Sequence, residues 1–172
     1  MKRKLLKQVC GQSFLFKGGF MVRIESEDKN SFISFIYVEC EEGRCPSVCF
    51  SLEIQNEDFK GYNKSIWIEF DMLKKFVDEL ISLELHRKGN AKLEAMSPNE
   101  FNLQIERIDM SGHLNLTYNI ARQTYSRKPY LLALSGGFEL ESSLFSAIVR
   151  DFKDLYIFTQ ELKVNPIINQ HI

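Results

Sequence analysis

Four cysteines and three histidines are the side chains of this 172-residue chain best suited to metal or nucleophilic chemistry. The run Cys40-x4-Cys45-x3-Cys49 has the closeness of zinc ligands, but no second close pair follows it and Cys10 stands far away. We therefore expect the cysteines to be small strand residues that stay reduced and bind no metal. A metal or redox role and an incidental disulfide are the alternatives.

The three histidines are widely separated, at positions 86, 113 and 171. None has a cysteine or serine nearby in a pattern that indicates a nucleophile and its base. The glycine pairs at 18–19 and 136–137 lack the spacing of phosphate-binding loops. The sequence therefore predicts no catalytic residues, no metal site and no cofactor, and it favours a protein that is not an enzyme.

Charge is nearly balanced, with 22 basic and 23 acidic residues and a net charge of −1. A general nucleic-acid binder is expected to be strongly basic, so we expect no nucleic-acid partner. Acidic side chains cluster at an expected turn, where Glu39, Glu41 and Glu42 stand close together. Such clusters are commonly solvated surface, but they also steer basic protein partners. These three glutamates are the candidate partner-binding residues. A smaller basic cluster surrounds Tyr125 and contains Arg122, Arg127 and Lys128.

Alternating apolar residues predict the strands of the first third of the chain. They are Phe20, Val22 and Ile24, then Ile33, Phe35 and Tyr37, then Val48, Phe50, Leu52 and Ile54. A two-residue loop at Glu42-Gly43 pairs the last two strands, with Tyr37 opposite Val48 and Phe35 opposite Phe50. In that register Cys40 faces Cys45, and Cys49 points to the same side.

Helical spacing predicts two helices, near residues 71–85 and 143–156. The first buries Leu73, Phe76, Val77, Leu80 and Leu83, begins at an Asp71 N-cap and stops at Gly89-Asn90. The second is capped by Ser142 or Ser143. Trp67 precedes the first helix on a strand, where a ring covered by a neighbour is favoured over a binding aromatic.

The second half of the chain predicts an antiparallel meander. A loop at Pro98–Glu100 sets Leu93 against Ile105, and a loop at Asp109–Gly112 sets Ile105 against Leu116 and Leu103 against Tyr118. A last strand through Tyr130, Leu132 and Leu134 is expected to break or bulge at Ser135–Gly137. The fold class is therefore α+β, mainly antiparallel, with about eight strands in a sandwich-like or strongly curved sheet and two helices.

Residues 1–172 are expected to form one domain, with loosely packed ends at 1–12 and 160–172. The basic start of the chain lacks the apolar run of a signal peptide. No stretch approaches the roughly 18 apolar residues of a membrane helix, so we expect a cytoplasmic protein without a membrane partner.

The stretch 58–155 resembles a bacterial family that includes the immunity proteins of wall-associated polymorphic toxins. The resembling features are Phe59-Lys-Gly61 before Trp67, Leu73, Phe76 and Leu80, Gly89-Asn-Ala-Lys-Leu93, Phe101-Asn-Leu-Gln-Ile105, Asp109-Met-Ser-Gly-His113, and Phe138-Glu-Leu140 followed by Leu144. The family's aspartate-rich tryptophan motif is absent, and Ser31–Glu41 occupies its place.

This resemblance implies a non-enzymatic protein that binds and neutralises a cognate toxin domain. The alternative is a β-rich carrier of a small molecule or lipid, since a curved sheet with two covering helices can enclose an apolar ligand. Fourteen phenylalanines suit such a cavity, but they suit an ordinary core equally well.

Overall fold

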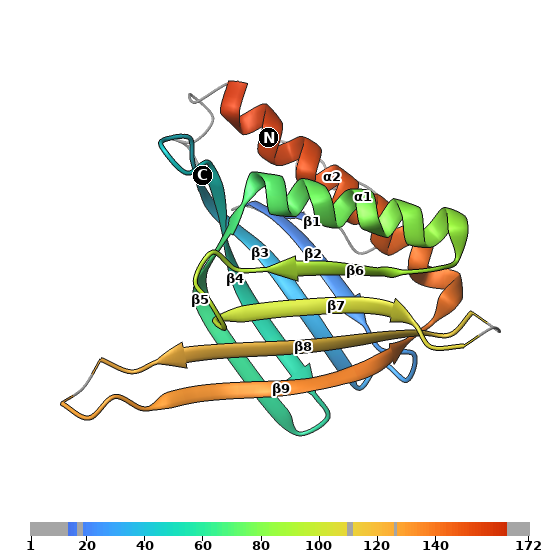
Figure 1. Cartoon of the computed structure of the whole chain (residues 1–172), viewed down its shortest axis with the longest axis horizontal. Helices are drawn as coiled ribbons and strands as arrows, with labels where there is room; N and C mark the ends of the chain where they lie inside the picture. Colours follow the sequence, from blue (N-terminus) through green and yellow to red (C-terminus); the bar gives the residue numbers. More distant parts are fainter. Residues whose placement is uncertain (1–13, 17–18, 110–111, 126, 165–172) are drawn as a thin grey trace, which may run out of the picture.

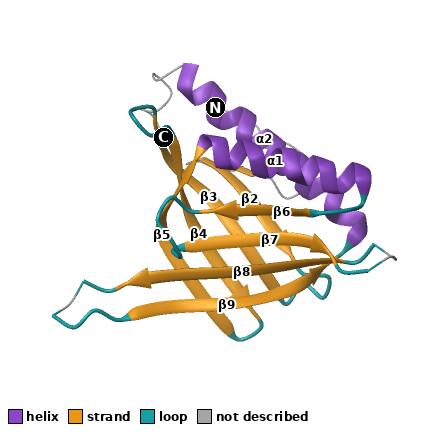
Figure 2. Cartoon of the chain, viewed as in Figure 1, coloured by secondary structure: helices purple, strands orange, loops and turns teal. Residues whose placement is uncertain are grey.

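The computed structural model describes residues 14–16, 19–109, 112–125 and 127–164. Within these residues two antiparallel sheets are accompanied by two helices, which lie side by side along one side of the sheets (Figures 1 and 2). The predicted α+β class is confirmed. The described strands number nine, because a three-residue strand precedes the expected ones.

The first sheet contains five strands in sequence order: β1 (Phe14–Phe16), β2 (Gly19–Glu25), β3 (Ser31–Glu41), β4 (Ser47–Asn56) and β5 (Phe59–Glu69). The second contains four: β6 (Asn90–Glu94), β7 (Phe101–Arg107), β8 (Leu114–Gln123) and β9 (Leu131–Leu140). Helix α1 (Phe70–His86) joins the sheets, and α2 (Phe145–Val164) follows β9 through the short turn η1 (Ser142–Leu144). The strands of the two sheets cross at a steep angle (Figure 1).

Aromatic side chains join the two sheets and both helices in one core. Phe35 of β3 meets Phe101 of β7 edge-on at 5.8 Å between ring centroids, and it meets Phe152 of α2 at 5.4 Å. Phe152 in turn lies 5.1 Å from Phe76 of α1. All four rings are almost fully buried. Edge-to-face packing of this kind fills space and adds favourable electrostatics to the burial of apolar area.

The β7–β8 hairpin has the predicted register, with Leu103 opposite Tyr118 and Ile105 opposite Leu116. The β6–β7 register is wrong by two residues, since Leu93 pairs with Leu103 rather than with Ile105. The reason is tertiary, because the Met96 N–H donates to the carbonyl of Trp67 in β5 and so ends β6 early. A two-residue shift keeps every side chain on its predicted face.

The β3–β4 hairpin is also two residues out of the predicted register. Tyr37 pairs with Phe50 and Phe35 with Leu52, and a bulge at Val38 changes the register toward the turn. Residues 42–46 form a longer loop than expected, because Pro46 cannot donate a ladder hydrogen bond and β4 starts at Ser47. The expected pairing of Cys40 with Cys45 is therefore wrong, and Cys40 faces Val48.

Strand β9 runs without a break from Leu131 to Leu140, so the expected bulge at Ser135–Gly137 is wrong. The two glycines serve close packing instead. A Cβ added at Gly137 would lie 2.6 Å from the Leu116 carbonyl oxygen. One added at Gly136 would lie 2.8 Å from both Asn56 Nδ2 and the Tyr118 hydroxyl.

Helix α1 buries the predicted stripe, but its ends differ from the expectation. Glu69 rather than Asp71 occupies the N-cap, and Arg87 ends the helix in the left-handed conformation (φ 54°) before Gly89 is reached. The Arg87 N–H donates to the Leu83 carbonyl in this C-cap, which leaves Gly89 in the following turn.

Helix α2 starts after η1, so Ser142 and Ser143 lie in that turn rather than at the helix cap. It reaches Val164 rather than ending near residue 156. Its apolar stripe continues through Phe158 and the buried Leu162, and Phe158 stacks on Phe20 at 5.3 Å. Residues 160–164 of the expected loose end are thus helical, while 1–12 and 165–172 lie outside the described residues.

Candidate functional site

The predicted acidic residues stand at the projecting end of the β3–β4 hairpin, at the upper left of Figure 1. Glu39 and Glu41 end β3, Glu42 begins the loop, and all three side chains are exposed. Arg44 is the one basic residue between positions 39 and 46, a segment that we call the acidic tip. Three carboxylates against one guanidinium give the acidic tip a charge of −2.

The cysteines near the acidic tip have three different environments. Cys45 is exposed in the loop, Cys40 is half-buried, and Cys49 is buried between Glu39 of β3 and Trp67 of β5. Burial raises the pKa of the Cys49 thiol, although its hydrogen bond to the Ser65 hydroxyl (3.6 Å) opposes this. Trp67 is half-buried on the neighbouring strand, as the sequence favours. Cys10 lies outside the described residues.

A second projecting element was not singled out as a binding site from the sequence. The far end of the β8–β9 hairpin extends past β5 at the lower left of Figure 1. We call residues 121–134 the arm. Its large side chains are strongly exposed: Tyr125 at 99%, Leu131 at 70%, Leu132 at 61% and Tyr130 at 58%. The alternation of Tyr130, Leu132 and Leu134 predicted a strand here, and β9 begins at Leu131 with Tyr130 and Leu132 both exposed.

The charge of the arm is opposite to that of the acidic tip. Arg122, Arg127 and Lys128 are its charged residues, and no Asp or Glu occurs anywhere between Asp109 and Glu139. The arm therefore carries +3 in a chain whose total is −1. The Lys128 ammonium lies 5.9 Å from the centre of the Tyr130 ring, within the range of a cation–π contact.

The arm is positioned by a close crossing of the two sheets. A Cβ at Gly61 of β5 would lie 2.9 Å from Leu134 Cδ2 and 3.3 Å from Ile120 Cγ2. Only glycine allows β5 to approach the second sheet this closely without displacing Leu134. Past this crossing β8 and β9 extend beyond β5 (Figure 1), and Leu131 and Leu132 are both exposed there.

Two recesses separate the arm from β5. One, of about 340 Å³, is lined by Lys60 and Tyr62 of β5 and by Arg122, Leu132 and Leu134. The other, of about 540 Å³, lies between Ser65 of β5, the Ser97–Glu100 turn, and Tyr125 and Leu131 of the arm. Both are open surface grooves that combine apolar walls with basic side chains.

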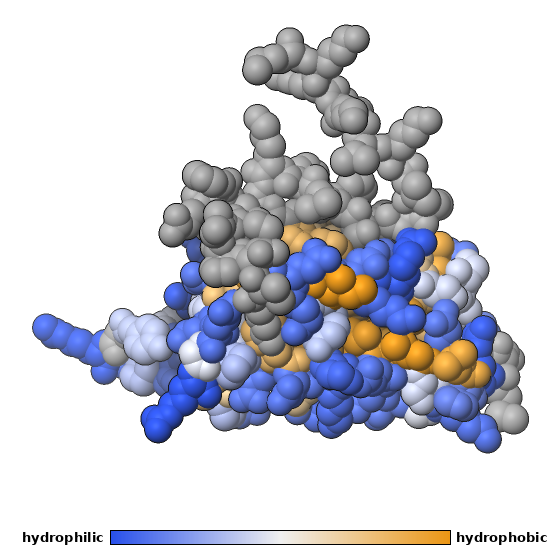
Figure 3. Space-filling model, turned by 90° about the horizontal axis from the view of Figure 1, so that it is seen from above, coloured by the Kyte–Doolittle hydropathy of each residue, from blue (hydrophilic) through white to orange (hydrophobic). Residues whose placement is uncertain are grey.

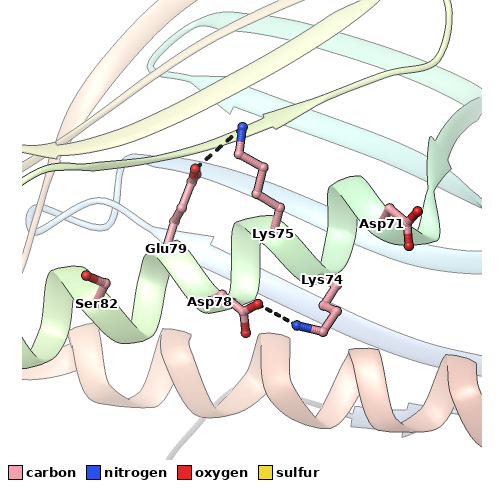
Figure 4. Close-up of a pocket in the computed structure, with 6 residues that line it drawn as sticks. All are labelled: Asp71, Lys74, Lys75, Asp78, Glu79 and Ser82. Carbon is pink, nitrogen blue, oxygen red and sulfur yellow. Dashed lines mark hydrogen bonds and ion pairs between the residues drawn. The ribbon is translucent and has the colours of Figure 1, made fainter.

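A third recess, of about 470 Å³, lies along the exposed face of α1 (Figure 4). Its charged residues pair with one another, Lys74 with Asp78 at 2.6 Å and Lys75 with Glu79 at 3.7 Å. Pairs of this kind on an exposed helix are screened by solvent and contribute little to stability. This recess is a solvated helix face. The adjoining surface in Figure 3 is likewise mostly hydrophilic, with smaller apolar patches.

His113 takes part in the turn between β7 and β8. Its Nδ1 lies 2.6 Å from Asp109 Oδ2, while the N–H groups of Gly112 and His113 donate to Asp109 Oδ1. The histidine and these amides lower the pKa of Asp109 to about 2, and the carboxylate raises the pKa of His113. The pair closes a turn on which η1 also rests, since the Ser142 hydroxyl donates to the Gly112 carbonyl.

In the described part of the chain, no group of three or more His, Cys, Asp or Glu side chains is placed to hold a metal. No described helix is long and apolar enough to cross a membrane. Comparison of the chain with protein-family models, with curated proteins and with solved structures gives no match. The predicted resemblance to the toxin-immunity family therefore stays a prediction.

Proposed function

We propose that this chain is a non-enzymatic protein-binding domain that, like the immunity proteins it resembles, neutralises a cognate toxin domain. The observation that carries the proposal is the arm, where Leu131, Leu132 and two tyrosines stand in solvent. Exposed apolar clusters rimmed by polar residues mark interaction surfaces in soluble proteins. Tyrosine and arginine are also enriched where binding energy concentrates.

The acidic tip has a different part in this proposal. Its carboxylates are exposed and held on a hairpin, so they attract a basic partner over a distance without burying apolar area. Charges of this kind act mainly on the rate of association, whereas desolvated aromatic and aliphatic side chains act on the rate of dissociation. The acidic tip would then guide the partner, and the arm would hold it.

The interior gives the carrier alternative no comparable support. Phe35 meets three rings, from β4, β7 and α2, at centroid distances of 5.4–6.0 Å where a ligand between sheets and helices would sit. A carrier requires a cavity in that place. The recesses described above are open grooves at the surface.

Co-expression tests the proposal, since immunity genes typically lie beside their toxin genes. The toxin domain encoded next to this gene is induced with and without the present chain, and growth is measured. We expect growth arrest by the toxin domain alone and recovery when this chain is present, together with a complex on size-exclusion chromatography. Failure to protect, with a lipid or metabolite found on the purified chain by native mass spectrometry, would establish the carrier instead.

A further inference from the structure

Strand β9 is the last strand of its sheet, and its outer edge changes character along its length. At the C-terminal end this edge is covered: the Glu139 carbonyl accepts from the Glu27 N–H at 3.1 Å, and the Gly137 carbonyl accepts from Asn56 Nδ2 at 3.2 Å. Both carbonyls point away from β8. Because backbone groups alternate in direction along a strand, the odd-numbered residues of β9 turn their N–H and C=O groups outward.

Leu131, Ala133 and Ser135 continue this series into the arm. β9 pairs with β8 alone, and within the described residues no backbone hydrogen bond reaches these three from the outer side. Three outward N–H groups and three outward C=O groups thus stand in a row. Such an edge is a template for a further strand.

The side chains around this edge indicate what kind of strand it suits. Leu131 and Leu132 point to opposite faces of β9 and are 70% and 61% exposed, so an added strand would find apolar area on both faces. The cations nearby are Arg122, Arg127 and Lys128 of the arm and Lys60 across the groove, and one carboxylate, Glu100, lines the second recess opposite Leu131. Acidic side chains on the added strand would pair with these cations.

We propose that the edge of β9 over Leu131–Ser135 binds an extended, acidic segment of a partner protein as an additional β-strand. This inference rests on the proposed function and names the docking element and the chemistry of the docked segment. A second copy of this chain fits less well, because its own edge brings another arm with a charge of +3. A nucleic acid fits less well because a sugar–phosphate backbone has no row of N–H donors for the three outward C=O groups, even though Tyr125 and Tyr130 offer rings on which bases can stack.

The probe is a fluorescein-labelled octapeptide of alternating Glu and Val, with capped ends. Its affinity for the full chain is measured by fluorescence anisotropy at low salt. Two related peptides accompany it: one with Lys in place of Glu, and one with alternate backbone nitrogens methylated so that they cannot donate. We expect the first peptide to bind at least about tenfold more tightly than either of the others, since main-chain pairing and charge both contribute.

Ala133→Pro is the matching variant of the protein. The Ala133 N–H points outward, so proline removes an edge donor without removing a β8–β9 hydrogen bond. We expect this variant to lose about tenfold or more in affinity for the Glu-Val peptide while its circular dichroism is retained. Gln123→Pro is the control on β8, the opposite edge of the same arm, and its affinity should stay unchanged. If Ala133→Pro does not fold, the charge reversal R127E/K128E keeps the test, with an equal loss expected.

Several results would overturn this inference. They are equal binding of the Glu-Val and Lys-Val peptides, undiminished binding of the methylated peptide, and displacement of the Glu-Val peptide by oligo(dT). A dimer in sedimentation that Ala133→Pro abolishes would assign the edge to a second copy. Peptide binding without protection from the toxin would remove the immunity role and leave the docking edge. Protection from the toxin without peptide binding would remove the docking edge and leave the immunity role.

Discussion

The acidic tip and the arm are the ends of two long antiparallel hairpins that project past the crossing of the sheets, yet they expose opposite chemistry. The acidic tip shows three carboxylates, and the large apolar residue beside it, Val38 at the β3 bulge, is 47% exposed. The arm has an unbroken register and exposes two leucines and two tyrosines under a charge of +3. Charge alone leaves a surface well solvated, whereas exposed apolar area costs free energy until it is covered. The arm is therefore the stronger indication of binding.

Both hairpins depend on the same aromatic core, and removal of its central ring should affect them together. Phe35→Ala deletes the ring that contacts Phe101 and Phe152. We expect it to lower the free energy of unfolding by about 3–5 kcal/mol, as for other buried aromatic residues. Urea denaturation followed by circular dichroism measures the change. A loss below about 1 kcal/mol would contradict the common core.

The reaction rates of the cysteine thiols report how accessible the strands near the acidic tip are to solvent. In a Cys10→Ser background, Cys45 should react with a disulfide reagent on the order of 100-fold faster than Cys49, which is buried and has a raised pKa. A Cys49→Ala variant identifies the slow phase. Similar rates for both thiols would mean that β4 is readily exposed at this end.

Exposed leucines should matter to binding and little to stability. Replacing Leu131 and Leu132 by Ser is expected to change the free energy of unfolding by less than about 0.5 kcal/mol. The same change should weaken binding of the toxin domain by about 2 kcal/mol, or ~30-fold, measured by calorimetry. Leu85→Ser on α1 is the control, because Leu85 has the same 70% exposure as Leu131. If Leu85→Ser weakens binding as much as replacement of Leu131 and Leu132 does, the arm is not the binding surface.

Charge reversal at the acidic tip should act on the rate of association. Replacing Glu41 and Glu42 by Lys is expected to slow association with the toxin domain about threefold to tenfold at low salt, with the dissociation rate unchanged. Surface plasmon resonance separates the two rates. Asp154→Lys with Glu161→Lys, two exposed positions of α2, changes net charge equally at another site. If that control slows association as much, net charge explains the effect and the acidic tip does not.

The smallest effect concerns the Asp109–His113 pair. Because folding lowers the pKa of Asp109, the ionised carboxylate stabilises the fold fully above the ordinary pKa of Asp, near 4. This stabilisation is lost as pH falls toward 2. Folding raises the pKa of His113, mainly through Asp109 and also through Glu139 and Glu27, so the protonated imidazole stabilises the fold fully below about pH 6.5. This stabilisation is lost at higher pH. The Tm difference between the wild type and His113→Asn should therefore peak between about pH 4 and 6. In an Asp109→Asn background the peak should vanish.

Local patterns predicted what depends on local structure. The β7–β8 register followed from a turn closed by Asp109 and Gly112, which contact one another directly. The β6–β7 register failed by two residues because the Met96 N–H donates to Trp67 of another sheet. The β3–β4 register failed because Pro46 cannot donate to the ladder and its carbonyl accepts from Phe70 of α1, which lengthens the turn. Long-range contacts of this kind leave no local signature.

The two candidate surfaces differ in the same way. The sequence predicted an exposed acidic turn, and Glu39, Glu41 and Glu42 are exposed. It did not predict that Leu132 is exposed, because exposure there depends on where β5 crosses the second sheet at Gly61. Two signals were available: the uninterrupted run Leu131-Leu-Ala-Leu134, and the lack of acidic residues from 110 to 138.

The open edge of β9 also bears on how the chain avoids aggregation. Leu131-Leu-Ala-Leu134 is short, apolar and uncharged, which is the composition of a segment that forms intermolecular sheets. Arg127, Lys128 and Pro129 precede it, separated from it by Tyr130, and Gly136 and Gly137 follow it after Ser135. Like charges and proline flanking an apolar strand act as gatekeepers, because they make stacking of identical segments unfavourable. The basic residues that would pair with the proposed acidic segment would thus also keep unbound molecules apart, and high salt, which screens this repulsion, is expected to favour their self-association.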